Sequence, residues 1–167
     1  MSEERPTRDY VALPRFTGRA WVFMHDLAAE TILPSTARGL SPEAARQHLF
    51  GDLSAEIAGS IEKGDVLVGG ENFGHGPGAR AAVDALRAAA VSVVLARSFA
   101  DDFAAAAIEA GIPALILDAP ESIRTGHTVR VDIDGGRVVN RSSGDRFVIR
   151  DLTDEFLDRL RACFADE

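Results

Sequence analysis

The stretch Val66-Leu-Val-Gly-Gly-Glu-Asn-Phe-Gly-His-Gly-Pro-Gly-Ala-Arg80 joins a short apolar run to an alanine-rich segment, and five glycines fall between Gly69 and Gly78. Glycines before a helix let backbone N–H groups approach a ligand, and the helix start adds partial positive charge. This arrangement favours a carboxylate or a phosphate. The alternative is that the glycines only make a sharp turn, with Pro77 in the first turn of the helix.

The turn contains residue types suited to acid–base chemistry and to anion binding, but it matches no common phosphate-binding loop. The turn lacks both the Gly-Lys-Ser/Thr ending and the Gly-x-Gly-x-x-Gly spacing of such loops. His75 has little core to pack into within a glycine turn, and Arg80 is a residue type that pairs with carboxylates. We expect Glu71 and Asn72 to fix the turn through backbone hydrogen bonds, and Ser98 to cap the helix that follows it.

Three short apolar runs alternate with two helical segments in the middle of the chain. The runs are Val66–Val68, Val91–Leu95 and Ala114–Leu117. Strands that alternate with helices predict a parallel sheet, and ligands of such sheets bind beyond the carboxyl ends of the strands, where the glycine turn lies. Gly111 is placed to end the second helix in the left-handed conformation, and Pro113 prevents its continuation.

The flanking segments complete an α/β fold in which a partly parallel sheet is flanked by helices. Before the glycine turn we expect a strand at 17–23, a helix from Ser41-Pro-Glu43 to about Phe50, and a short helix at 55–61. After Asp118 the pattern becomes antiparallel. The predicted later elements are strands at 128–133, 137–139 and 146–149 and a final helix capped by Thr153.

Composition and charge exclude several classes of protein. The net charge of −8 disfavours nucleic-acid binding, which requires clustered basic residues. No apolar stretch approaches the roughly 20 residues that cross a bilayer, and the N-terminus lacks the apolar core of a secretory signal. We therefore expect a cytoplasmic protein that binds neither nucleic acid nor membrane. Residues 1–16 are predicted to be a solvated leader, and residues 17–167 a single domain.

Metal-binding residues are sparse. Cys163 is the only cysteine, which excludes an internal disulfide and an iron–sulfur or zinc site held by this chain's own thiolates. We expect Cys163 to pack on the apolar face of the final helix. The four histidines, at positions 25, 48, 75 and 127, lack the paired spacing of a zinc site, so no metal site is predicted. A self-sufficient enzyme with a dissociable metal is a third hypothesis beside the two given below.

Five motifs along the chain resemble one known family. They are Gly18-Arg-x-Trp-x-Phe23, Ile32-Leu-Pro34, Lys63-Gly-Asp-Val-Leu-Val-Gly-Gly-Glu-Asn-Phe-Gly74, Ala96-Arg-Ser-Phe-Ala100 and Gly111-Ile-Pro113. Together they are similar to the small subunit of isopropylmalate dehydratase, the swivel domain of the aconitase superfamily. The resemblance covers nearly the whole chain. It implies an aconitase-type swivel fold with a C-terminal antiparallel hairpin.

The resemblance also implies a partner and a reaction. In this family a large subunit carries an iron–sulfur cluster, and the small subunit closes over it to complete the active site. The small subunit contributes contacts to the substrate carboxylate and a serine alkoxide base. The implied activity is that of a hydro-lyase or isomerase of leucine biosynthesis, which acts as a heterodimer on a hydroxy-di- or tricarboxylate. Without the large subunit, the isolated chain is expected to be able to form a homo-oligomer.

Two signatures depart from the family pattern. Where the family reads Cys-Gly-Ser-Ser-Arg-Glu-His after Asn-Phe-Gly, this chain has His75 to Ala81, so that a proline, a glycine and an alanine replace the two serines and the arginine. Arg80 stands one position late, which rotates its side chain by about 100° on a helix. Where the family reads Asp-Asn-x-Asp-Thr-Asp-x-Ile-Ile-Pro, this chain has His25 to Pro34, with alanines at two positions and Glu30 at a third.

Two functional hypotheses follow. In the first, the chain is a hydro-lyase subunit in which His75 is the general acid or base and Arg80 or Arg38 binds the substrate carboxylate. The full set of predicted substrate-binding residues is Gly74, Gly76, Gly78, Arg80, Glu30, Thr31 and Arg38. In the second, the chain is a non-catalytic binding or regulatory subunit that has lost the serines and the arginine of the family site.

Overall fold

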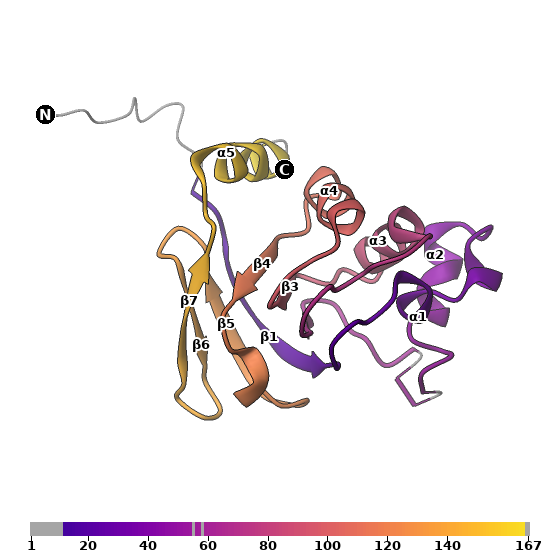
Figure 1. The fold of residues 1–167 in the computed structure, drawn as a ribbon, viewed down its shortest axis with the longest axis horizontal. Coiled ribbons are helices and arrows are strands. Elements are labelled where there is room, and N and C mark those ends of the chain that lie inside the picture. The colour runs from indigo at the N-terminus through magenta and orange to yellow at the C-terminus, as the bar shows by residue number, and fades with distance from the viewer. Residues whose placement is uncertain (1–11, 55, 58, 166–167) are drawn as a thin grey trace, which may run out of the picture.

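The strands of this chain close into a barrel. The computed structural model describes residues 12–54, 56–57 and 59–165. In this part the strands follow the order β1-β2-β3-β4-β7-β6-β5 around the barrel (Figure 1). Strands β1 to β4 run parallel, and the remaining pairs are antiparallel. The bounds are β1 Arg15–Val22, β2 Val66–Val68, β3 Val93–Ala96, β4 Ala114–Leu117, β5 Thr128–Asp132, β6 Arg137–Asn140 and β7 Arg146–Arg150.

Strand β1 closes the barrel because it pairs on both sides. Its second half, from Ala20 to Val22, pairs with β2 in parallel, whereas Arg15 to Arg19 pair with β5 in antiparallel. The predicted α/β class, with parallel strands and a C-terminal antiparallel hairpin, is confirmed. The prediction of a sheet that is simply flanked by helices is incomplete. Closure depends on a pairing between distant segments, which local periodicity does not report.

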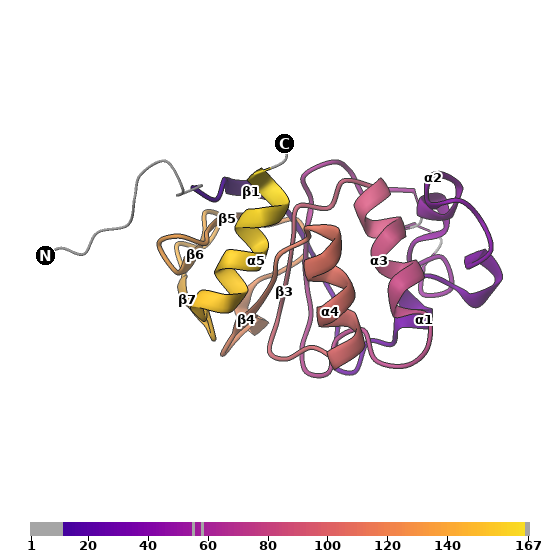
Figure 2. The same ribbon diagram turned by 90° about the horizontal axis from the view of Figure 1, so that it is seen from above.

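Two helices form a layer outside the parallel strands, and a third covers one end of the barrel. Helices α3 and α4 lie side by side along the parallel strands, and α5 lies beside β1 and the antiparallel strands (Figure 2). The helices are α1 Ala29–Ile32, α2 Pro42–Ala45, α3 Ala79–Ala88, α4 Asp101–Ala110 and α5 Asp154–Ala165, with short 3₁₀ turns at Ser35–Ala37, Arg46–His48 and Pro120–Ser122.

Successive side chains of a strand point to opposite faces of the sheet, and this gives the protein two hydrophobic cores. Val66 and Val68 point into the barrel, where Leu160 of α5 also packs, whereas Leu67 belongs to the cluster beneath the helices. Strands that are buried on both faces read as continuous apolar runs, which explains the uniform apolar character of β2 and β3. The carboxyl ends of the parallel strands are thus held by packing on both sides, and the loops that follow them start from a rigid base.

Most local predictions hold, with differences at element ends. The Ser41 hydroxyl accepts the Ala44 N–H at 3.3 Å, and Gly111 ends α4 with φ of 81°, as predicted. The helix from Ser41 stops at Ala45 and continues only as a 3₁₀ turn, and the described residues of 55–61 form turns rather than the predicted helix. The Thr153 hydroxyl accepts the Phe156 N–H at 3.1 Å, the bond expected of a helix cap.

The predicted leader and domain limits concern residues that are only partly described. Residues 1–11 lie outside the described part, and strand β1 already includes Arg15 and Phe16. The single domain at 17–167 stays a prediction. No helix among the described residues is long and apolar enough to cross a membrane.

Candidate functional site

The glycine turn leaves β2 and is held by backbone groups. The Glu71 N–H donates to His25 Nδ1 at 2.9 Å, and the Asn72 N–H donates to Ser98 Oγ at 2.8 Å. Glu71 and Asn72 therefore fix the turn through their backbones, as predicted. The prediction that Ser98 caps a helix is wrong: α4 begins at Asp101, and Ser98 instead supports the turn.

His75 is anchored to the segment that leads into α1. Its Nε2 lies 2.9 Å from the carbonyl oxygen of Asp26, and its own carbonyl accepts the Ala29 N–H at 2.8 Å. Because a carbonyl oxygen can only accept, the neutral imidazole carries its hydrogen on Nε2 and leaves Nδ1 as a proton acceptor. The half-buried ring is thus held in one orientation, which is what a general base requires. The partner oxygen belongs to the backbone, so no side-chain pattern could have revealed it.

Arg38 lies directly against the last glycine of the turn. A Cβ at Gly78 would come within 2.8 Å of Arg38 Nε and 3.2 Å of Cζ, and Gly78 has φ of 96°. The Arg38 Nη2 donates to Glu30 Oε2 at 2.6 Å. Its Nε is buried and has no hydrogen-bond partner within the described part of the chain. The structure therefore brings three of the predicted residues together, and the Nε–H of this guanidinium is buried without a partner among the described residues.

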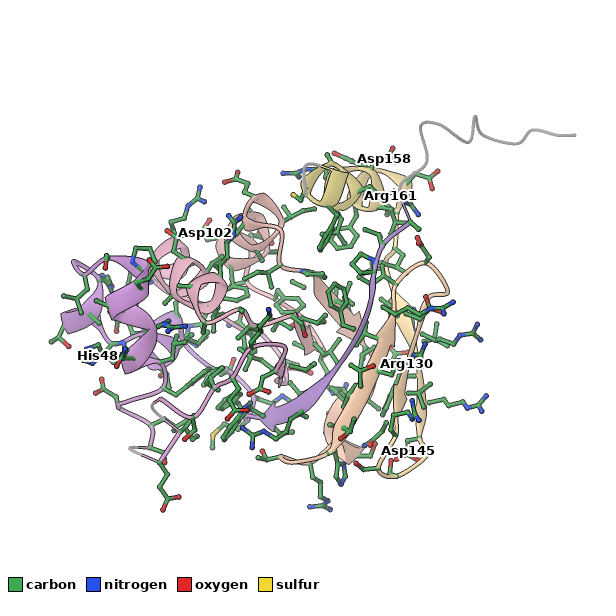
Figure 3. All side chains as sticks on the ribbon, turned by 180° about the vertical axis from the view of Figure 1, so that it is seen from behind. His48, Asp102, Arg130, Asp145, Asp158 and Arg161 are labelled. Carbon is green, nitrogen blue, oxygen red and sulfur yellow. The ribbon has the colours of Figure 1, made fainter. Side chains whose placement is uncertain are left out.

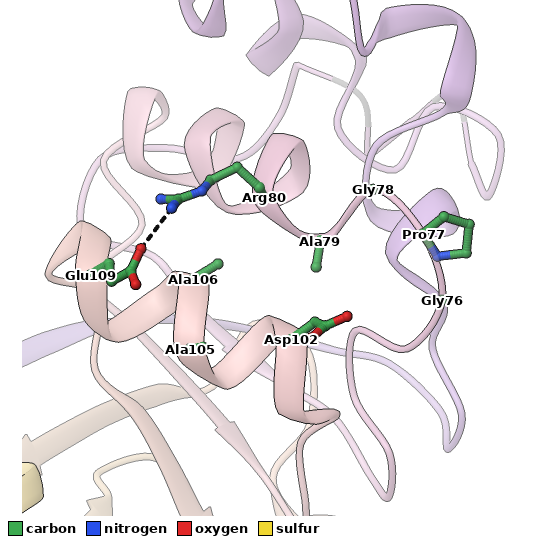
Figure 4. A pocket seen from close by; sticks show the side chains of 9 residues that line it. All are labelled: Gly76, Pro77, Gly78, Ala79, Arg80, Asp102, Ala105, Ala106 and Glu109. Carbon is green, nitrogen blue, oxygen red and sulfur yellow. Dashed lines mark hydrogen bonds and ion pairs between the residues drawn. The ribbon is translucent and has the colours of Figure 1, made fainter.

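Arg80 is directed away from this group. Its Nη2 donates to Glu109 Oε1 of α4 at 2.6 Å, in a pair that is more than half exposed on both sides. Figure 4 shows this pair at one end of a cavity of about 300 Å³ that Gly76, Gly78 and Asp102 also line. Arg38 does not line this cavity. Two carboxylates face the cavity beside one occupied arginine, so it does not suit an anionic ligand.

Helix α3 begins at this turn without a side-chain cap. It starts at Ala79, after Gly78 as N-cap, so Pro77 precedes the helix and does not stand in its first turn, where the alternative interpretation of the glycines as a simple turn placed it. The first N–H groups of an α-helix have no partner within the helix. Those of α3 thus add donors and partial positive charge next to the Arg38 guanidinium.

Comparisons with curated proteins decide the family. The chain is 36% identical to "3-isopropylmalate dehydratase small subunit 2" of Archaeoglobus fulgidus over 149 residues, which cover 87% of this chain and 89% of that protein. It is also 36% identical to the 3-isopropylmalate dehydratase small subunit of Heliobacterium modesticaldum, over 82% of this chain and 84% of that one. The chain belongs to the family of 3-isopropylmalate dehydratase small subunits. No protein-family model matches it.

Solved structures agree with this family assignment. The 3-isopropylmalate dehydratase of Methanocaldococcus jannaschii superposes with a TM-score of 0.77 at 25% identity, over 92% of this chain and 99% of that chain. Aconitase X of Thermococcus kodakaraensis superposes with a TM-score of 0.54 at 21% identity, over 84% and 93% of the two chains, which supports the fold alone. The superposition on the Methanocaldococcus jannaschii protein, which covers most of both chains, supports the family assignment.

Thr31 lies apart from the Arg38 group in this small subunit. It lines a separate, largely apolar cavity of about 300 Å³ together with Phe23, Met24 and Leu53. Thr31 is the neighbour of Glu30 on α1, but it lines this cavity and Glu30 does not. The apolar cavity adjoins His75 through Asp26, which lines the cavity and whose carbonyl oxygen accepts the His75 N–H.

A further charged pair stands at the same edge of the barrel. Arg97 follows β3 and donates its Nε–H to Glu121, in the 3₁₀ turn after β4. This hydrogen bond lowers the pKa of the Glu121 carboxyl and raises the pKa of Arg97. The bond occupies Nε of Arg97, in contrast to the free Nε of Arg38.

The described residues contain no group of three or more His, Cys, Asp or Glu side chains that could hold a metal ion. The Cys163 Sγ donates to the carbonyl of Ile108 at 3.2 Å, which ties α5 to α4. This packing role agrees with the expectation for Cys163. An iron–sulfur cluster thus has no ligand set in the described part of this small subunit.

Proposed function

We propose that this chain is the small subunit of an aconitase-like hydro-lyase that acts, with a cluster-bearing large subunit, on a hydroxy-di- or tricarboxylate. The names of its relatives support isopropylmalate-type substrates as the first to test. The cluster chemistry resides in the large subunit in this proposal. The residues of this chain bind one substrate carboxylate and move a proton.

The position of Arg38 on the glycine turn is the observation that carries this proposal. Its guanidinium lies over Gly78, is held at Nη2 by Glu30 and keeps Nε unpartnered. A carboxylate bound on the Arg38 side of the turn, outside the cavity that Asp102 and Glu109 line, would accept from the guanidinium and from first-turn backbone N–H groups of α3. Arginine binds carboxylates through such directed N–H groups, and helix N-termini favour anions. Arg38 thus replaces the arginine that the family carries at the position of Ala79.

His75 supplies the proton-transfer group in this proposal. The Asp26 carbonyl holds the ring at Nε2, so Nδ1 is the nitrogen available to a substrate. Histidine is the side chain that general acid–base catalysis uses most often, which suits His75 to exchange a proton with a hydroxy-acid. It takes the place of the family's serine alkoxide, for which residues 77–79 offer no hydroxyl.

Reconstitution with the large subunit of the same organism tests the proposal. The complex is assayed for hydration and dehydration of 3-isopropylmalate and of a panel of other hydroxy-di- and tricarboxylates. We expect Arg38→Ala to lower kcat/KM by about a hundredfold, as loss of a charged hydrogen-bond partner does. Arg80→Ala is the matched control, because it removes the same side chain from the exposed pair with Glu109. Equal effects of the two substitutions would exclude the role of Arg38.

One observation favours the alternative, a non-catalytic subunit. Residues 77–79 carry neither hydroxyl nor charge, and Arg80 is occupied by Glu109. On this alternative the reconstituted complex forms but turns over no hydroxy-acid of the panel. The same experiment therefore separates the two functions.

A further inference from the structure

The segment that follows β1 holds the glycine turn at both of its ends. Residues 25–29 run beside residues 71–75, and backbone hydrogen bonds link the two segments. The bonds are Asp26 N–H to the Glu71 carbonyl at 2.8 Å, Gly74 N–H to the Leu27 carbonyl at 2.7 Å and Ala29 N–H to the His75 carbonyl at 2.8 Å. The Asp26 carbonyl also accepts the His75 ring N–H at 2.9 Å. The orientation of the His75 ring therefore depends on how firmly residues 25–29 hold the turn.

His25 supplies the side chain that closes the start of this contact. Its Nδ1 accepts the Glu71 N–H at 2.9 Å, whereas His75 lies at the far end of the contact. A ring nitrogen accepts a hydrogen bond only while it carries no hydrogen, so the neutral His25 ring has its hydrogen on Nε2. Glu71 is exposed, so its N–H would bond to water if this acceptor were lost. His25 thus fixes the start of the turn, and Asp26 fixes its end.

The turn is shaped to receive the His25 ring. A Cβ at Gly70 would overlap His25 Nδ1 and would lie 2.6 Å from Cε1 and 2.8 Å from Cγ. The backbone of Gly70 is not left-handed, so the ring, and not the backbone conformation, requires glycine at this position. The Gly70 carbonyl accepts the Arg97 N–H at 3.0 Å, which holds this part of the turn from the β3 side. The ring is therefore seated against a backbone that has little room to move.

We propose that His25 is a positioning residue for His75. The inference rests on the proposed function, which assigns the proton transfer to His75. The Nδ1 acceptor of His25 fixes the turn against residues 25–29, and the Asp26 carbonyl then meets the His75 ring in one orientation. A displacement of about 1 Å at a catalytic group can lower a rate by about a hundredfold. His25 touches no substrate in this role and acts only through the turn.

Two substitutions separate the hydrogen bond of His25 from the rest of its ring. Asparagine carries its Oδ1 acceptor on Cγ, as histidine carries Nδ1, so His25→Asn can still accept the Glu71 N–H, whereas His25→Ala cannot. In the reconstituted complex we expect His25→Ala to lower kcat about ten- to a hundredfold. Its KM should stay within about threefold of the wild-type value, because Arg38 is held by Glu30 and not by this contact. His25→Asn should restore kcat to within about threefold of the wild type.

His48→Ala is the matched control for the loss of a histidine. His48 is exposed like His25, but it ends the 3₁₀ turn Arg46–His48, and Figure 3 shows it at the outer edge of the molecule among the short helices. Its replacement should leave kcat and KM unchanged. Gly70→Ala is a second, independent test, because its Cβ displaces the His25 ring without altering His25 itself. It should lower kcat as His25→Ala does.

Nuclear magnetic resonance of the full ¹⁵N-labelled chain tests the positioning without turnover. The ¹⁵N shifts of the His75 ring report which nitrogen carries the hydrogen, and they are measured at about pH 8.5, where an ordinary imidazole is neutral. Wild type and His25→Asn should show the Nε2–H form that the Asp26 carbonyl selects. His25→Ala and Gly70→Ala should show a mixture of the two neutral forms. The Glu71 amide should exchange its hydrogen at least about fivefold faster in these two variants.

The two measurements have distinct outcomes. A pure Nε2–H form of His75 in both His25→Ala and Gly70→Ala overturns the proposal. So does a kcat of His25→Asn as low as that of His25→Ala, because the acceptor would then not be what matters. If the wild-type complex turns over no hydroxy-acid, the proposed function fails, and the spectrum of the His75 ring alone decides whether His25 positions it.

Discussion

Arg38 and Gly78 are in direct contact, and the contact exists only because residue 78 has no Cβ. A methyl group there would lie 2.8 Å from Arg38 Nε. The two residues come from different elements, the 3₁₀ turn after α1 and the N-cap of α3. Arg38 reaches the turn from outside α3, and Gly78 leaves room for it.

Substitution of Gly78 tests this contact. Gly78→Ala places a Cβ against the guanidinium and forces alanine into φ of 96°, so we expect Arg38 to shift and kcat/KM to fall about tenfold or more. Gly76→Ala is the control, since Gly76 has φ of 88° but open space around it. Both variants should lose about 1–3 kcal/mol of unfolding free energy from backbone strain, measured in urea. Equal kcat/KM values for the two would show that the contact does not serve the substrate.

Two substitutions of His75 distinguish chemistry from positioning. His75→Gln keeps an N–H that can reach the Asp26 carbonyl, whereas His75→Ala removes it. If His75 moves a proton, both variants lose about 10²- to 10⁴-fold in kcat, while only His75→Ala loses about 1 kcal/mol of stability. A His75→Gln enzyme with wild-type kcat would assign the ring a structural role. Steady-state kinetics and thermal unfolding of the reconstituted complex provide the two measurements.

The sequence predicted which residues are candidates for this site, but not which side chains they hydrogen-bond to. The turn, the role of Glu71 and Asn72, and the candidacy of His75 all follow from local composition. The choice between Arg38 and Arg80 does not, because it depends on Glu109 of α4 drawing Arg80 away and on Glu30 holding Arg38. Both are contacts between elements, and the spacing of residues along the chain does not encode them.

For the fold as well, the sequence predicted local elements but not the contacts between distant segments. Strand β4 and the turn after α4 match their predicted positions, because apolar runs and Gly111 are local signals. The prediction of a short helix at 55–61 is wrong: Gly59 has φ of 79°, outside the right-handed helical region, and Ile57 and Ile61 pack against the core from turns. Closure of the barrel depends on β1 meeting β5, a tertiary pairing that overrides local preference.

The Arg97–Glu121 pair predicts a weak dependence of stability on pH. The hydrogen bond from Arg97 lowers the pKa of Glu121 from an ordinary value of 4.5. A carboxyl whose pKa is depressed in the folded state contributes stability above that ordinary value and loses it as the pH falls through the depressed one. On acidification below about pH 4.5, the melting temperature of Glu121→Gln should therefore fall less than that of the wild type. At pH 7 the two melting temperatures should differ only by the small contribution of an exposed ion pair. An identical acid limb in wild type and variant would contradict the assignment.

Gly18 provides a test of the barrel that does not depend on function. It lies in β1 at the point where a Cβ would clash with the carbonyl oxygen of Gly64, a backbone atom that cannot rotate away. The neighbouring Asp65 carboxylate holds the Trp21 indole N–H at 2.7 Å, so the turn has little freedom to retreat. We expect Gly18→Ala to lower the unfolding free energy by about 2–4 kcal/mol.

Gly39 is the matched control for this substitution. No atom lies within 4 Å of the position that an alanine methyl group would take there, and the backbone is not left-handed. Gly39→Ala should therefore leave stability unchanged or raise it by up to about 1 kcal/mol. Urea unfolding of both variants measures the difference. Equal stability of Gly18→Ala and Gly39→Ala would mean that residue 18 has room for a Cβ, and hence that β1 lies farther from the Gly64 carbonyl than described here. The register between β1 and β2, which positions the glycine turn, would then have to be revised.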